Sequence, residues 1–208
     1  MRSLLALLVV VVVGVNAQFS STGQTSIVNA HNDLRSQIAK GNYTAKTTKK
    51  PAASNMLKMV WDTTIATSAQ TYADTCPTGH SGTNGVGENL YWLWTSGSLG
   101  DLNQYGAKAS AAWQNEFQQY GWASNLLTVD LFNTGIGHAT QMAWANTGKI
   151  GCGVKACYDS SNKMNKVAVV CQYKLQGNYL NQNIYTTGST CSACPTGTKC
   201  ETSSGLCV

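Results

Sequence analysis

Acidic and imidazole side chains are scarce in this chain of 208 residues, and the scarcity limits the chemistry available to it. The only glutamates and histidines are Glu88, Glu116, Glu201, His31, His80 and His138. Few groupings of catalytic or metal-binding side chains are therefore available.

Three common catalytic or cofactor motifs are also missing. No HExxH sequence is present, "GHSG" around Ser81 does not have the GxSxG pattern, and "GVGENL" has only two of the three glycines of a dinucleotide fingerprint and follows no strand. These absences argue against a zincin protease, a serine hydrolase with a nucleophile elbow and a dinucleotide-binding fold.

Only one long apolar run occurs, "LLALLVVVVVGV" from Leu4 to Val15, preceded by Arg2 and followed by "NA". This pattern predicts a signal peptide over residues 1–17, with cleavage after Ala17. The run is shorter than the about 20 residues that span a bilayer, and no second run follows. We therefore expect a secreted, extracellular protein without a transmembrane segment.

All eight cysteines lie after the predicted cleavage site. An even number of cysteines in an exported chain favours four disulfides over metal thiolates or a catalytic thiol. The tail sequence "CSAC" resembles half of a zinc knuckle, but it lacks a second CxxC and a nearby histidine. Disulfides are the preferred interpretation there too.

The net positive charge, formally +5, is concentrated between residues 40 and 58, which include five lysines and no acids. This run predicts a solvated loop or, alternatively, a contact with anionic lipid or glycan. No nucleic acid partner is expected, because the protein is exported and the run lacks interleaved aromatics. The sequon "NYT" makes Asn42 a predicted glycosylation acceptor.

Apolar periodicity predicts three helices, with a capping box of Ser21 and Gln24 at the start of the first. The first helix ends at Gly41, the second covers about 63–73 and the third about 107–120. Two β-branched segments around the turn "DSSNKMN" predict an antiparallel hairpin between Ile150 and Leu175. The fold class is therefore α+β, followed by a tail that only disulfides can hold together.

Four polar side chains have positions that suit a site. His80 and His138 each follow a glycine, and Glu116 borders the apolar face of the third predicted helix. If they converge with Glu88, two imidazoles and two carboxylates surround one point, which suits Zn²⁺ or another divalent cation. The alternative is that they are scattered polar residues. His31 lies on the apolar stripe of the first helix and is predicted to be a hydrogen-bonded core histidine.

A cluster of aromatic residues follows Glu88. Tyr91, Trp92 and Trp94 either fill the core or form the rim of an apolar groove that takes a lipid.

Four ordered motifs resemble one family. "HNDLR" from His31, "GENLY" from Gly87, "GHATQMAW" from Gly137 and "VVCQYKLQGNYL" from Val169 are similar to the signatures of the CAP superfamily, the cysteine-rich secretory, antigen 5 and pathogenesis-related-1 proteins (SCP/TAPS). The resemblance covers about 25–180 and is greatest to venom-allergen-like proteins of nematodes.

The resemblance implies an α-β-α sandwich over residues 18–183 and a hinge-like, cysteine-rich tail over 184–208. It also implies that His80, His138, Glu88 and Glu116 form the family's metal-capable tetrad. The implied disulfides are Cys76–Cys152, Cys157–Cys171, Cys191–Cys200 and Cys194–Cys207.

The resemblance also implies a function. We expect an extracellular protein that binds a sterol, fatty acid or other small lipid, with a divalent-cation-capable cleft, in signalling or immune modulation. One alternative is a zinc-dependent hydrolase in which Glu88 or Glu116 acts as general base. Another is an interaction protein that engages an extracellular receptor through its loops.

Overall fold

The middle layer of the molecule is a four-stranded sheet. The computed structural model describes residues 19–208, so the predicted signal peptide lies outside the described residues. The strand order is β3 (Val60–Trp61), β6 (Lys149–Asp159), β7 (Met164–Lys174), β4 (Gly87–Thr95). β6, β7 and β4 are antiparallel, whereas β3 runs parallel to β6.

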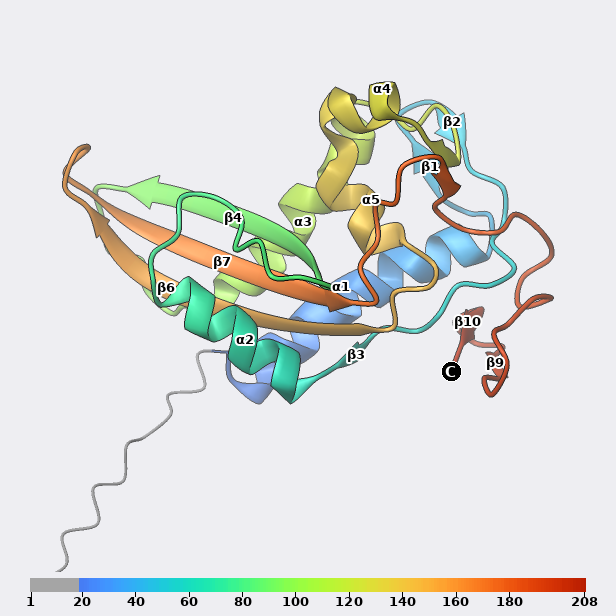
Figure 1. Ribbon diagram of the computed structural model, residues 1–208, viewed down its shortest axis with the longest axis horizontal. Helices are drawn as coiled ribbons and strands as arrows, with labels where there is room; N and C mark the ends of the chain where they lie inside the picture. The colour runs from blue at the N-terminus through green and yellow to red at the C-terminus, as the bar shows by residue number, and fades with distance from the viewer. Residues whose placement is uncertain (1–18) are drawn as a thin grey trace, which may run out of the picture.

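Helices cover both faces of this sheet. α2 (Thr63–Ala73) packs on β6 and β7 from one side, and α1 (Ser21–Ala39), α3 (Gln104–Gln119) and α5 (Gly137–Ala143) form the layer on the other side (Figure 1). The α-β-α sandwich is therefore confirmed, and the hairpin of β6 and β7 lies where the sequence predicts it.

Shorter elements complete the chain, and they are β1 (Thr44–Ala45), β2 (Thr48–Lys49), β5 (Leu126–Leu127), α4 (Val129–Leu131), η1 (Phe132–Ile136), β8 (Gln182–Asn183), β9 (Cys200–Glu201) and β10 (Leu206–Cys207). Between residues 19 and 208, the helices are all too short or too polar to cross a bilayer.

The first helix shows why periodicity is informative. Ile27, Leu34 and Ile38 are buried along one side of α1, as their three- and four-residue spacing predicts. The predicted capping box is wrong by one residue, because the N-cap is Ser20, whose hydroxyl accepts the Gly23 N–H at 3.4 Å.

The close approach of α2 to the sheet depends on two glycines of β6. A Cβ atom on Gly151 would lie 2.1 Å from the Ala66 backbone nitrogen, and one on Gly153 would lie 2.4 Å from the Gln70 Cα. Any side chain at these positions would push the helix away from the sheet.

Two predicted disulfides are wrong. The structure joins Cys76 to Cys157 and Cys152 to Cys171, not Cys76 to Cys152 and Cys157 to Cys171. Cys152 and Cys171 are directly opposite in the β6–β7 ladder, with Cα atoms 4.1 Å apart. Cys157 is five residues from Cys152, so it faces the opposite side of the sheet, where Cys76 follows the end of α2.

The cysteine-rich tail has the pairings that the resemblance implies, Cys191–Cys200 and Cys194–Cys207. No tail cysteine is left free to bind zinc, which excludes a zinc knuckle. The tail packs on the sandwich: Leu206 is buried in the main core, and Glu201 pairs with Lys58 at 2.8 Å.

A buried arginine joins α1 to two later segments of the chain, one before β3 and one around the end of α5. Arg35 is completely buried, and each of its five N–H groups donates to a backbone carbonyl at 2.8–3.0 Å. The acceptors are the carbonyl oxygens of Leu57, Met142, Trp144, Ala145 and Thr147. Burial lowers the pKa of Arg35 to about 9.

We expect Arg35→Met to lower the free energy of unfolding by about 4 kcal/mol or more, because it leaves several buried carbonyls without donors. Urea unfolding followed by circular dichroism measures this change. Lys40→Met, at the exposed residue that follows the last turn of the same helix, is the matched control and should change stability by less than about 1 kcal/mol. A loss of similar size in both variants would contradict this role of Arg35.

Candidate functional site

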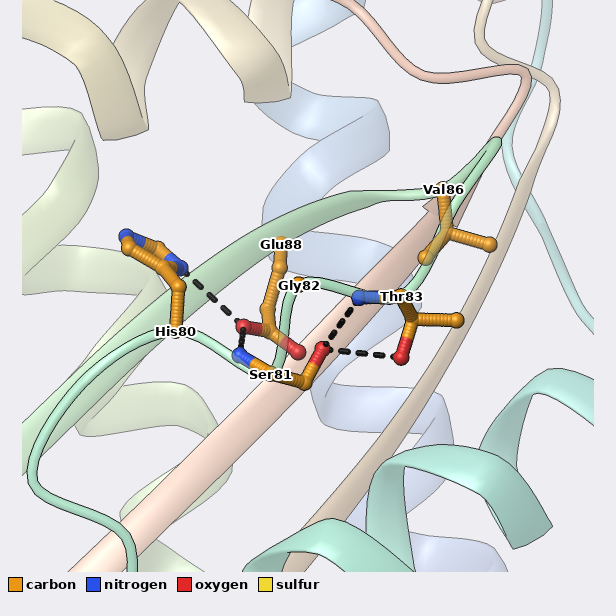
Figure 2. Close-up of a pocket in the computed structure, with 6 residues that line it drawn as sticks. All are labelled: His80, Ser81, Gly82, Thr83, Val86 and Glu88. Carbon is orange, nitrogen blue, oxygen red and sulfur yellow. Dashed lines mark hydrogen bonds and ion pairs between the residues drawn. The ribbon is translucent and has the colours of Figure 1, made fainter.

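Glu88 lies on β4, and it is held by donors from three directions. Its Oε1 accepts hydrogen bonds from the His80 imidazole at 3.0 Å and the Ser81 N–H at 2.7 Å, and its Oε2 accepts one from the Gln172 amide at 2.9 Å (Figure 2). Burial alone would raise the pKa of this carboxyl, but the donated hydrogen bonds prevail and lower its pKa to about 2. Glu88 is therefore ionised at neutral pH.

His80 comes from the loop before β4 and points its other ring edge away from Glu88 (Figure 2). Its side chain is 61% exposed, whereas that of Glu88 is 6% exposed. The hydrogen bond to Glu88 raises the pKa of His80 above its usual value. When the ring is neutral, Nδ1 must carry the proton to donate to the carboxylate, so Nε2 keeps its lone pair.

Glu116 and His138 form a second pair, between α3 and α5. Glu116 Oε1 is 2.5 Å from His138 Nδ1, and its Oε2 accepts the backbone N–H groups of His138 and Ala139, each at 3.0 Å. Trp113 stacks on the imidazole with ring centroids 6.0 Å apart. One carboxylate therefore orients the ring and also satisfies donors at the start of α5.

A buried polar network holds the backbone of His138. Asn89 donates to the His138 carbonyl and to the Tyr173 hydroxyl, both at 3.1 Å. Tyr173 is 2.9 Å from His31 Nε2, while His31 Nδ1 is 2.8 Å from the Ile27 carbonyl. Burial lowers the pKa of His31 to about 4, so it is the neutral core histidine that the sequence predicts.

The two His–Glu pairs are neighbours through β4, since Glu88 and Asn89 are consecutive and Asn89 contacts His138. In the described part of the chain, however, the donor atoms of no three of these side chains lie within 4.8 Å of one another. The structure therefore shows two oriented pairs, and not a cluster of four ligands around one point.

An open pocket of about 190 Å³ borders the first pair (Figure 2). It is lined by His80, Ser81, Gly82, Thr83, Val86 and Glu88. The Ser81 hydroxyl donates to Thr83 Oγ1 at 2.9 Å and accepts the Thr83 N–H at 3.1 Å. Because Ser81 bonds to Thr83 and His80 bonds to Glu88, the two side chains do not form a nucleophile–base pair.

The predicted aromatic groove does not form from all three residues. Alternation along β4 places Tyr91 on the main-core side of the sheet, whereas Trp92 packs on the α2 side and shares that side with Trp94. Trp92 and Trp94 donate their indole N–H groups to the Pro77 carbonyl and to Asp159. A shared rim is therefore possible only for the two tryptophans.

Sequence reasoning missed several residues that support the site. Gln172 and Tyr173 lie in the "VVCQYKL" segment, and Asn89 in "GENLY", so both motifs marked the right stretches without giving these side chains a role. The Ser81 backbone donor has no signal in sequence.

We expect the His80 imidazole to titrate with a pKa above 6.5, because protonation strengthens its bond to ionised Glu88. Proton NMR of the ring resonances over pH 5–9 measures it, with His80→Gln assigning the signal. Glu88→Gln should move this pKa down, while Glu201→Gln, which alters the half-buried carboxylate paired with Lys58, should leave it unchanged. An unchanged His80 pKa in Glu88→Gln would refute the pairing in solution.

Comparison with known proteins gives consistent results. The model of the "Cysteine-rich secretory protein family" (CAP) matches residues 28–173. The chain is 40% identical to the Ancylostoma secreted protein of Ancylostoma caninum over 201 residues, which cover 90% of this chain and 46% of that relative. The chain thus spans about half the length of that protein.

Two solved structures are similar over nearly their whole length. The crystal structure of NaASP2 with Zn²⁺ is 35% identical, has a TM-score of 0.82, and matches 93% of this chain and 98% of its own. BmVAL-1 is 36% identical, has a TM-score of 0.81, and matches 91% of this chain and 95% of its own.

Proposed function

The chain belongs to the cysteine-rich secretory protein (CAP) family, and we propose that it is an exported binding protein whose His80 and His138 hold one divalent cation. One observation carries this proposal: each imidazole bonds through Nδ1 to a carboxylate, Glu88 or Glu116. Metal-binding histidines in proteins are usually oriented in this way by a carboxylate that accepts their other N–H.

The donor set fits such an ion. Two neutral Nε2 atoms suit zinc and similar borderline cations, and two protein ligands leave further coordination positions for water or a bound molecule. In this proposal Glu88 and Glu116 orient the ligands instead of binding the ion directly. His80 is mostly exposed on a loop, so its Nε2 edge is accessible from solvent while Nδ1 stays bonded to Glu88. The zinc in the NaASP2 structure, a relative 35% identical, is consistent with this proposal.

The same geometry favours binding over hydrolysis. A general base needs a free oxygen and a pKa near the working pH. Both oxygens of Glu88 and both oxygens of Glu116 already accept hydrogen bonds, and the pKa of Glu88 is about 2. Neither carboxylate is poised to take a proton from water.

Zinc binding tests the proposal. Equilibrium dialysis of the metal-free protein at pH 7.5 should give one zinc per chain. The double variant His80→Ala/His138→Ala should lose this binding, and Glu88→Gln should weaken it about 10- to 100-fold. Glu201→Gln is the matched control and should bind as tightly as the wild type. Stoichiometric zinc in the double histidine variant would refute the site.

The second part of the proposal is a small hydrophobic ligand, a sterol or a fatty acid. Trp92 and Trp94 share one side of β4, and Trp94 is 42% exposed, so they offer an aromatic contact surface. The pocket beside Glu88 is smaller than the roughly 300–1,000 Å³ of typical ligand sites, which favours a ligand lying on this surface.

Tryptophan fluorescence during titration with cholesterol or palmitate should show a saturable change. Trp94→Ser should weaken binding about tenfold or more, whereas Tyr158→Ser, which removes another exposed aromatic ring, should not. Absence of any saturable change would leave the third possibility, an extracellular receptor engaged through surface loops.

A further inference from the structure

A row of exposed apolar side chains runs along α4 and η1. Val129 is 50% exposed and Phe132 is 39% exposed, and their three-residue spacing places them on one side of the helix. Three residues further along is Gly135, and the Tyr120 ring lies over it: a Cβ atom on Gly135 would be 3.2 Å from this ring. Tyr120 is itself 53% exposed. The apolar row therefore consists of Val129, Phe132 and Tyr120.

Two lysines lie at the Tyr120 end of this row. Lys46 is at the tip of the hairpin of β1 and β2. This tip is close to Tyr120, because the Lys46 backbone N–H donates to the Gln118 side chain at 2.9 Å and the Lys46 side chain lies 3.8 Å from where a Cβ atom on Gly121 would be. Lys46 and Lys49 are exposed, and across residues 19–208 neither pairs with an acidic group. In Figure 1 β2 and α4 both lie at the upper right of the molecule.

We propose that the apolar row and these two lysines form a membrane-docking face that binds the surface of an anionic lipid bilayer. Aromatic and aliphatic side chains flanked by lysines suit the boundary between headgroups and acyl chains. Asp130 is the one acidic side chain on the segment 129–136, so the face is positive on balance.

The lysines select this partner over a second copy of the chain. A symmetric dimer through the face would place four lysines and only two Asp130 carboxylates in one interface, and this net positive charge opposes association. An anionic surface instead attracts each lysine. The inference extends the proposed function without depending on it: Phe132 contacts Gly137, next to His138, so docking would bring the cation site close to the lipid.

Vesicle sedimentation tests the docking face. The chain without its predicted signal peptide, residues 18–208, is mixed with vesicles of phosphatidylcholine alone or with one quarter phosphatidylserine, in 0.1 M NaCl. We expect binding to the anionic vesicles only, and loss of binding in 0.5 M NaCl because salt screens the lysines. The variant Asn42→Gln is run in parallel, so that a glycan at the predicted sequon does not mask the face.

Two double variants separate the contribution of the lysines from that of the apolar side chains. Lys46→Glu/Lys49→Glu should lower the partition coefficient about 25-fold or more, at about fivefold for each lysine. Val129→Ser/Phe132→Ser should lower it about tenfold. Tyr158→Ser/Lys163→Glu is the matched control at the far β6–β7 turn, where both side chains are exposed, and should bind like the wild type.

Three results would overturn the proposal. The first is no binding of the wild type to anionic vesicles, and the second is an equal loss in the control variant. The third is a dimer in analytical ultracentrifugation that Val129→Ser/Phe132→Ser abolishes, which would assign the face to a second copy of the chain. Circular dichroism of every variant confirms that the fold is retained.

Discussion

The buried guanidinium of Arg35 ties α1 to the residues that follow α5, and the position of the site depends on that connection. All of its donors are used on backbone carbonyls, four of them between residues 142 and 147, where α5 ends and the chain turns toward β6. With the end of α5 fixed by Arg35 and its start bonded to Glu116, the helix has little freedom to move. His138 is therefore placed by a rigid frame and not by its own contacts alone.

The buried polar network next to His138 also fixes the position of this residue through hydrogen bonds between distant parts of the chain. His31, Tyr173 and Asn89 come from α1, β7 and β4; the hydrogen bonds of His31 and Asn89 meet at the Tyr173 hydroxyl, and Asn89 also donates to the His138 carbonyl. Each is buried, so the loss of one partner would leave another without its hydrogen bond in a place that water does not reach. The four sequence motifs, which are far apart in the chain, are thus joined by one hydrogen-bond network in the fold, which explains why they occur together.

The parts of the fold that sequence predicts best are those with a regular apolar period. The helix from Thr63 to Ala73 and the hairpin around residues 159–165 are correct because burial on one side imposes the spacing directly. β4 and α5 were not predicted, since glycines and polar residues dilute their patterns, and tertiary contacts with β7 and Glu116 stabilise them instead. The pairing of Cys76 was wrong for a related reason: which side of a sheet a cysteine faces depends on a register that one sequence does not show. For the site, residue types were enough to select two histidines and two glutamates, but not to show that they would form pairs.

Glu116 has two structural roles, and these limit which substitutions its position tolerates in evolution. Its carboxylate orients His138 and also accepts the first backbone donors of α5, so replacing it would harm folding whether or not the chain binds a cation. Selection for a stable fold alone would then keep this glutamate. The fold alone is therefore enough to explain a glutamate at this position, whereas His80, which is mostly exposed on a loop, contributes much less to the core.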